Sequence, residues 1–309
     1  MSPIDPTPRG KPLPTPPVHP TRLVYFGTPT MAVPPLAALV EAGVDVALVV
    51  TGADKRRGRR AEPTPTPVKI EAMRRGIPVA HDPDAAAEVG ADLGVVVAFG
   101  RIIRRPLLER LPMINLHFSL LPRWRGAAPV ERAIMAGDER TGVCVMAVEE
   151  GLDTGAVFAR RELTIRRGST AAVLGEQLTA VGSSLLVETL EAGLRDPEPQ
   201  VGTPVYAEKI RPADLELDGS RPAPALDRVV RVGGAWTTFG GKRLKVAEAR
   251  VVDEARGLPG ELHGDVVTCG QGGLRLLRVQ PEGRAEQAVT AWVNGARPVD
   301  RALLGGGSA

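Results

Sequence analysis

The chain has 309 residues, of which 43% are apolar and 24% charged, and this balance excludes a fibrous or wholly disordered protein. A formal net charge of +3 is too small to indicate nucleic-acid binding by itself. The two cysteines, Cys144 and Cys269, are isolated, which argues against a disulfide framework or a thiolate metal site. No run approaches the roughly 18 apolar residues of a membrane span. We expect a cytoplasmic protein of about two domains.

Residues 1–20 contain eight prolines and no apolar segment typical of an export signal. Proline lacks a backbone N–H and fixes φ, so such a stretch sustains neither helix nor sheet. The sequence predicts a disordered tail over 1–20.

From residue 21 onward, short apolar runs alternate with helical patterns. The runs expected as strands are 22–26, 44–50, 77–80, 93–99 and 113–117, and helices are expected after Pro29 up to Gly43 and over 67–76. Strands that alternate with helices imply parallel crossovers, and the near-continuous valine runs indicate strands covered on both faces. We therefore predict an α/β fold with a Rossmann-like open sheet in a domain over 21–205.

The next segments are expected to complete this domain and begin a second one. Residues 141–148 and 156–165 are predicted to form a hairpin, followed by a long helix over 170–192. A linker is expected over 206–225. Beyond it, short β runs separated by glycine predict a smaller, OB-like β-barrel domain over 226–305; these runs are 243–252, 260–263, 265–268 and 274–279, with helices over 225–232 and 288–294.

Polar residues cluster where the sheet is expected to bind ligands, beyond the carboxyl ends of its strands. Asn115 and His117 end the run MINLH, and their alternation with Leu116 points both side chains to one face. Asp153 lies between Gly151 and Gly155 in a turn. An amide, an imidazole and a carboxylate could therefore converge on one crevice.

These three groups are suited to acyl transfer without a covalent enzyme nucleophile. An amide donates to an oxyanion, an imidazole moves protons near neutral pH, and a carboxylate orients it. Ser119 lacks the G-x-S-x-G turn of a nucleophilic serine, and Cys144 is in mid-strand, so the attacking group would belong to the substrate. The alternative is that Asn115 and His117 only satisfy a strand end.

The segment 114–155, INLHFSLLPRWRGAAPVERAIMAGDERTGVCVMAVEEGLDTG, decides between them. It resembles the formyltransferase family that uses 10-formyltetrahydrofolate. Within that family the chain is most similar to the branch acting on methionyl initiator tRNA; the motifs are FGTP (Phe26–Pro29), PTPVK (Pro65–Lys69), WRGAAPV (Trp124–Val130) and YAEKI (Tyr206–Ile210). The resemblance spans about residues 22–300 and implies an enzyme of translation initiation and one-carbon metabolism.

The resemblance also implies roles for individual residues. The catalytic triplet falls on Asn115, His117 and Asp153. The residues implied to contact the folate are Val97, Ala98, Phe99, Gly100, Ser119, Leu120, Leu121 and Pro122. Leu120 and Leu121 would also pack well as core residues. The formyl donor would be 10-formyltetrahydrofolate, no metal is expected, and the protein is expected to be a monomer.

The loop after the second strand is rich in positive charge, in Lys55, Arg56, Arg57, Arg59 and Arg60. It resembles the family's loop for the tRNA acceptor stem, and such residues suit phosphate contacts. The alternative is a solvated basic loop. The barrel domain is likewise implied to bind tRNA. No phosphate-binding G-x-x-x-x-G-K motif is present.

Two positions depart from the family pattern. Phe118 stands where many relatives have glycine, and the segment 232–241 keeps only Trp236 of a Pro-Trp-Pro run. The alternatives left open are a formyltransferase acting on an amino sugar or another small amine, and a 10-formyltetrahydrofolate hydrolase. A non-enzymatic RNA-binding protein is disfavoured by the intact triplet.

Overall fold

The computed structural model describes residues 12–56, 62–253, 255–299 and 301–305. The chain divides into two compact units. The first consists of residues 1–125, 142–161 and 178–204, and the second of residues 126–141, 162–177 and 205–309. No helix of the described residues is both long and apolar enough to cross a membrane.

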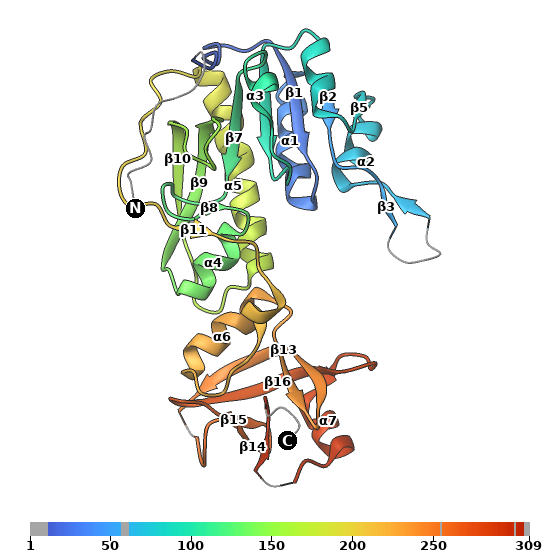
Figure 1. Cartoon of the computed structure of the whole chain (residues 1–309), viewed down its shortest axis with the longest axis vertical. Helices are drawn as coiled ribbons and strands as arrows, with labels where there is room; N and C mark the ends of the chain where they lie inside the picture. The colour runs from blue at the N-terminus through green and yellow to red at the C-terminus, as the bar shows by residue number, and fades with distance from the viewer. Residues whose placement is uncertain (1–11, 57–61, 254, 300, 306–309) are drawn as a thin grey trace, which may run out of the picture. The chain divides into compact units, whose positions relative to one another are not determined.

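Figure 1 shows the helices and strands and labels many of them. The α-helices are α1 (Val33–Glu41), α2 (Pro67–Arg74), α3 (Arg105–Leu108), α4 (Pro129–Ala136), α5 (Ala171–Ala192), α6 (Ala223–Val232) and α7 (Val289–Ala296), and the 3-10 helices are η1 (Thr30–Ala32), η2 (Pro83–Glu88) and η3 (Pro212–Leu215). The strands up to the long helix are β1 (Arg22–Gly27), β2 (Asp45–Val50), β3 (Lys55–Arg56), β4 (Pro63–Thr64), β5 (Val79–Ala80), β6 (Leu93–Val97), β7 (Met113–His117), β8 (Arg125–Gly126), β9 (Arg140–Ala147) and β10 (Val157–Thr164). The later strands are β11 (Tyr206–Ala207), β12 (Trp236–Phe239), β13 (Lys242–Val252), β14 (Glu261–His263), β15 (Val266–Thr268), β16 (Gly273–Pro281), β17 (Gln287–Ala288) and β18 (Ala302–Leu303).

A seven-stranded sheet has the order β10-β9-β7-β6-β1-β2-β5. The five neighbouring strands β7, β6, β1, β2 and β5 are parallel, and β9 runs antiparallel to β7. The Rossmann-like open sheet predicted from the sequence is therefore confirmed, as is the pairing of β9 with β10. β1 pairs with both β2 and β6, so the strand order reverses there, at the point where open α/β sheets place ligands.

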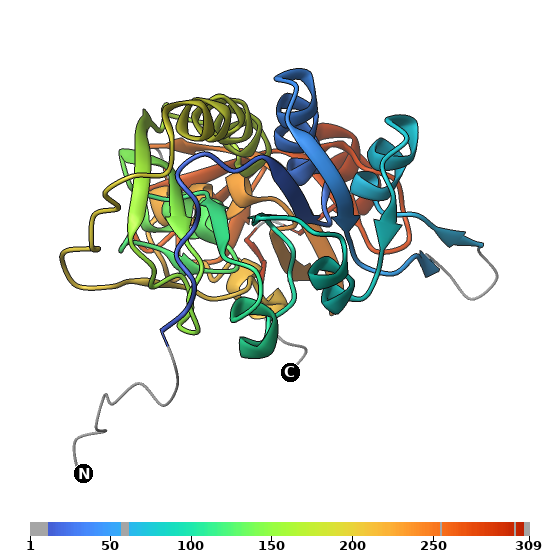
Figure 2. The ribbon, with the colours of Figure 1, turned by 90° about the horizontal axis from the view of Figure 1, so that it is seen from above.

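Helices cover both faces of this sheet, which is why its strands are nearly continuous apolar runs. Figure 2 shows α1 and α5 on one face and η2 and α3 on the other. On the α1 face, the buried Tyr25 hydroxyl donates to the Ala32 carbonyl at 2.6 Å, and Leu116 packs where Gly182 of α5 leaves room. On the other face, Val24, Phe26 and Met113 join a buried cluster with residues of η2 and α3.

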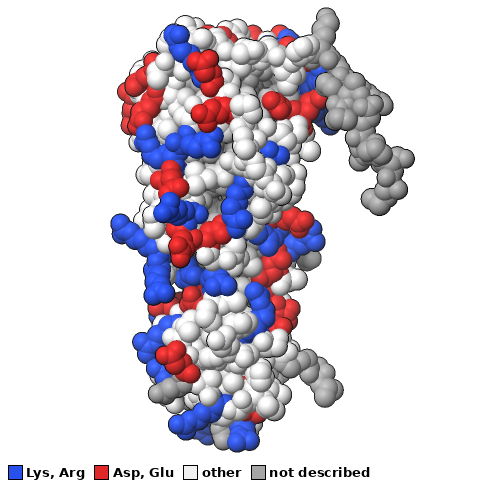
Figure 3. Space-filling model, turned by 90° about the vertical axis from the view of Figure 1, so that its left-hand side faces the viewer, with Lys and Arg blue, Asp and Glu red and all other residues white. Residues whose placement is uncertain are grey.

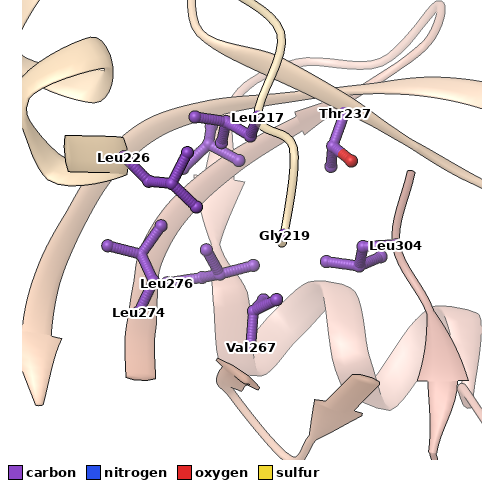
Figure 4. Close-up of a pocket in the computed structure, with 9 residues that line it drawn as sticks. Leu217, Gly219, Leu226, Thr237, Val267, Leu274, Leu276 and Leu304 are labelled. Carbon is purple, nitrogen blue, oxygen red and sulfur yellow. The ribbon is translucent and has the colours of Figure 1, made fainter. Parts of the chain in front are cut away.

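The second unit contains an antiparallel sheet with the order β12-β13-β16-β15-β14-β18, and β17 pairs with β16. Beyond β18, the Gly305 amide donates to the Thr238 carbonyl of β12 at 3.0 Å. This bond links the two ends of the strand order, so the sheet nearly closes and the predicted barrel is confirmed. A small cavity of about 20 Å³ remains inside it, and Figure 4 shows the residues that line it.

α4 and β12 are among the elements that were not expected from the sequence. The sequence analysis assigned no helix to the residues of α4. Pro129 supports the start of this helix because its missing N–H is not needed at that position. β12 pairs with β13 around Gly240 and Gly241, whose φ values of 55° and 72° suit a two-residue hairpin turn. The segment 232–241 is thus partly a strand.

The end of the predicted disordered tail also differs from expectation. Residues 12–20 have no helix or strand, yet the Val18 carbonyl accepts a hydrogen bond from Leu194 at 2.8 Å, and Leu13 packs against a buried cluster. Proline prevents regular structure without preventing an extended chain from packing through its apolar residues. Residues 1–11 lie outside the described residues.

Candidate active site

β7 presents Asn115 and His117 on the face of the sheet that carries η2 and α3. Asn115 lies between Val96 of β6 and Met146 of β9, and His117 pairs with Cys144. Alternation along the strand gives both polar residues the same face, as predicted. The Asn115 side chain is partly exposed and has no hydrogen-bond partner among the described residues, so its amide is available to a ligand.

The His117 ring is held between a carbonyl and a carboxylate. Its Nε2 lies 2.9 Å from the Trp124 carbonyl oxygen, and its Nδ1 lies 3.6 Å from Asp153 Oδ2. A carbonyl can only accept, so Nε2 bears a proton and Nδ1 faces the carboxylate. The side chains of His117 and Asp153 are 6% and 15% exposed, and poor solvation strengthens the interaction between them.

The turn between β9 and β10 brings Asp153 to His117. The turn starts beside the first residue of β7, where the Val148 amide donates to the Met113 carbonyl at 2.9 Å. It then folds back along β7 toward His117. Gln200 Nε2 donates to the carbonyls of Asp153 (2.9 Å) and Gly155 (2.8 Å). The predicted convergence of Asp153 on His117 is therefore present in the structure.

Backbone strain gathers in the three segments that form this site. Six non-glycine residues in the described part of the chain have positive φ, and three of them are Ala98 (46°), Trp124 (64°) and Asp153 (51°). Such conformations are disfavoured for residues with a Cβ and persist where the surroundings hold them, often at functional sites. All three lie in or beside the segments predicted to form the site.

The segments predicted to contact folate meet at one edge of the sheet, because β6 and β7 are parallel neighbours. Val97 and Phe99 are buried, Gly100 is exposed, and the Phe99 carbonyl accepts from Thr28 Oγ1 at 3.1 Å. After β7, Ser119 is fully buried and donates to the Arg123 carbonyl at 2.6 Å. Its hydroxyl is therefore committed to the loop.

The leucines of that loop are mainly packing residues. Leu121 belongs to a buried cluster with Cys144, Met146 and Val157, and Leu120 packs over Gly142, leaving no room there for a Cβ. Pro122 follows in a cis peptide bond and is partly exposed. The side chain of Leu121 is buried in this cluster, so a ligand would contact the loop through its backbone groups.

Cys144 is unsuited to nucleophilic attack, as predicted. It is fully buried beside His117, and burial raises the pKa of its thiol. Because the thiolate is the reactive form, Cys144 supplies no activated nucleophile to the site.

Two of the residues predicted to bind tRNA are described by the structure. Lys55 and Arg56 are exposed on β3, which pairs with β4 in a separate two-stranded ribbon. Arg57, Arg59 and Arg60 lie outside the described residues. At the base of the ribbon, Lys69 forms an ion pair with Asp54 at 2.7 Å. On the face shown in Figure 3, charges of both signs are interspersed.

Two residues of the site were missed by the sequence analysis. Arg125 and Gln200 are hydrogen-bonded to each other and lie 75 positions apart. Gln200 stands in a proline-rich stretch after α5 with no periodic pattern, so only the folded path reveals its neighbours.

Comparison with known proteins identifies the family. The formyl transferase pattern matches residues 21–190, and the pattern of the formyl transferase C-terminal domain matches residues 209–297. The chain belongs to the formyl transferase family. It is 44% identical to a methionyl-tRNA formyltransferase of Ruegeria pomeroyi over 89% of this chain and 97% of that protein, and 46% identical to one of Phenylobacterium zucineum over 89% and 96%.

The fold of the family is also found in a solved structure. An N-formyltransferase from Helicobacter canadensis, in complex with folinic acid and dTDP-3-aminofucose, superposes with a TM-score of 0.63 at 14% identity, over 83% of this chain and 98% of that one. This likeness shows the fold alone. In the described residues of the present chain, no group of three or more His, Cys, Asp or Glu side chains is placed to hold a metal ion.

Proposed function

We propose that this family member transfers the formyl group of 10-formyltetrahydrofolate to the α-amine of methionine on initiator tRNA, as a cytoplasmic monomer that supplies N-formylmethionyl-tRNA for translation initiation. The observation that carries the proposal is the 44% to 46% identity with methionyl-tRNA formyltransferases over nearly their whole length. The arrangement of Asn115, His117 and Asp153 supports it with suitable chemistry.

The reaction is a direct acyl transfer. The methionyl amine forms a C–N bond to the formyl carbon, the bond from that carbon to the folate nitrogen breaks, and a proton of the amine is delivered to the departing nitrogen. Asn115 donates to the oxyanion that develops on the formyl oxygen. Fixed donors of this kind are most effective where water is scarce, as the burial of His117 indicates.

His117 and Asp153 act as a pair. Because Nε2 donates to the Trp124 carbonyl, a neutral ring would turn the Nδ1 lone pair toward the Asp153 carboxylate. The contact is favourable when Nδ1 is also protonated, so we infer that Asp153 holds a cationic His117 beside the reacting formyl group. The charge on the ring stabilises the oxyanion, and the Asp153 carboxylate accepts a proton from the attacking amine and passes it to the departing folate nitrogen.

The folate donor fits the strand-end edge. Ala98 at positive φ redirects the backbone after β6, and the buried Val97 and Phe99 supply apolar surface next to it. A flat ring can be read at its edge by backbone groups and covered on its face by apolar side chains. We assign donor binding to 97–100 and to the loop 119–122.

Binding of the tRNA is assigned to the basic loop and the barrel. Lys55, Arg56, Arg57, Arg59 and Arg60 would contact acceptor-stem phosphates. We propose the domain division predicted above, with catalysis over 21–205, a linker over 206–225 and a tRNA-binding barrel over 226–305. Binding energy from these remote contacts would position the amine for attack.

The test is transfer of labelled formyl from 10-formyltetrahydrofolate to methionyl initiator tRNA by purified protein. Uncharged tRNA, free methionine and a reaction without acceptor are the controls. Label on charged tRNA alone supports the proposal. Formate released without an acceptor would indicate a hydrolase, and label appearing on a nucleotide-linked amino sugar instead would indicate a sugar formyltransferase.

A further inference from the structure

Gln200 and Arg125 form a side-chain bridge to the turn that carries Asp153. Gln200 Nε2 donates to the carbonyls of Asp153 and Gly155, at 2.9 and 2.8 Å. Gln200 Oε1 accepts from Arg125 Nε at 3.0 Å and Nη2 at 2.6 Å. Arg125 has only donors and the two carbonyls only accept, so the amide of Gln200 has one orientation that satisfies all four contacts.

The bridge connects the two segments that hold His117. Arg125 directly follows Trp124, whose carbonyl accepts from His117 Nε2 at 2.9 Å. At the other end, Gln200 holds the backbone of Asp153, whose carboxylate lies 3.6 Å from His117 Nδ1. The distance between the imidazole and the carboxylate thus depends on how these segments are held together.

The tip of the turn needs such support. Its two ends are fixed at the sheet, where Val148 donates to Met113 at 2.9 Å and Ala147 donates to Ala156 at 2.8 Å. Between them Asp153 adopts a φ of 51°, which is disfavoured for a residue with a Cβ. Gln200 supplies hydrogen bonds to this tip from outside the turn.

We propose that Gln200, oriented by Arg125, is a positioning residue that sets the Asp153 carboxylate against His117 for formyl transfer. This inference rests on the proposed function, since it assigns the bridge to that reaction. Gln200 contacts neither reacting atom in this scheme. Its loss should therefore slow the chemical step and leave the affinity for both substrates nearly unchanged.

The experiment compares Gln200→Glu with Gln177→Glu in steady-state formyl transfer. Glutamate at 200 keeps the length and the acceptor for Arg125 but cannot donate to the two carbonyls. The side chain of Gln177 on α5 makes no hydrogen bond with the described residues and receives the same change of charge. Misplacing a catalytic group by about 1 Å can cost about 100-fold in rate, so we expect kcat to fall roughly 10- to 100-fold in Gln200→Glu.

The KM values for the folate donor and the charged tRNA, and the melting temperature, should stay close to those of the wild-type protein and of Gln177→Glu. Arg125→Lys retains one donor for Gln200 Oε1 and should show a smaller loss of kcat. If Gln200→Glu does not fold, Gln200→Met and Arg125→Lys replace it in the same comparison.

The outcomes are distinguishable. If the wild-type protein is active and the kcat of Gln200→Glu lies within twofold of the wild-type kcat, the role of Gln200 is overturned and the proposed function stands. A loss of kcat matched by equal losses of donor and tRNA affinity would also overturn it, because it would show a general structural role. An inactive wild-type protein would remove the proposed function, and the inference with it.

Discussion

Two buried polar groups, His117 in the sheet and Thr237 in the barrel, have opposite surroundings. In the sheet, His117 is almost fully buried, yet both ring nitrogens face a partner, the Trp124 carbonyl and Asp153. In the barrel, the cavity in Figure 4 is lined by apolar residues and Thr237, whose buried hydroxyl has no partner among the described residues. The two partners of His117 fix its ring beside the candidate site, whereas the unpartnered Thr237 hydroxyl only lowers the stability of the barrel.

The largest expected effect is at the sheet site. Asn115→Ala removes the donor assigned to the oxyanion, and such losses cost about 10² to 10³ in kcat. Asp153→Asn removes the charge beside His117 and should cost about 10² to 10⁴. Both effects are measured by single-turnover transfer with saturating substrates. Rates near those of the wild-type protein would show that the triplet is not catalytic.

The basic loop should affect binding and leave the chemical step intact. Replacing Lys55, Arg56, Arg57, Arg59 and Arg60 with alanine removes candidate phosphate contacts. For each phosphate that is no longer neutralised, the slope of log affinity against log salt concentration should become shallower by about 0.7 to 0.9. Titration of tRNA binding at several salt concentrations measures this slope. Arg166→Ala with Arg167→Ala, on an exposed turn, is the control, and equal slopes in all three proteins would leave the loop only a role in solubility.

The barrel should respond in stability alone. Thr237→Val replaces the unpartnered hydroxyl with a methyl group of similar size and removes its desolvation cost. We expect the free energy of unfolding to rise by about 1 kcal/mol, with kcat for formyl transfer unchanged. Urea denaturation and the transfer assay provide the two measurements. Destabilisation of the barrel would mean that Thr237 has a hydrogen-bond partner after all.

The thiols should show the smallest effect. Burial raises the pKa of Cys144, and it raises the pKa of Cys269 to about 11. At a pH of about 8, below the ordinary pKa of a cysteine thiol that burial raises further, both thiols are protonated and poorly nucleophilic. Iodoacetamide should therefore leave the native protein unmodified and active, while modifying both cysteines in urea, as mass spectrometry would detect. Rapid modification of Cys144 in the native state would contradict its burial.

Much of the fold follows from the sequence because its patterns are local. The valine runs of β2 and β6, and the alternation of Asn115 and His117 around Leu116, are visible within a few residues. β12 was missed because its pairing with β13 depends on a turn of two glycines rather than on an apolar pattern. Gln200 was missed for a different reason: its partners are distant in the chain, and no periodicity surrounds it. Patterns locate strands and the residues at their ends, but not the distant side chains that hold a turn in place.

The central claim is that the sheet site acylates an amine carried by tRNA. It is tested most directly by offering methionyl initiator tRNA and a nucleotide-linked amino sugar together, with labelled 10-formyltetrahydrofolate, and measuring kcat/KM for each acceptor. The account predicts that nearly all label reaches the methionyl-tRNA and that Asn115→Ala nearly abolishes its transfer. Preferential labelling of the amino sugar, or transfer to tRNA that survives Asn115→Ala at the wild-type rate, would contradict it.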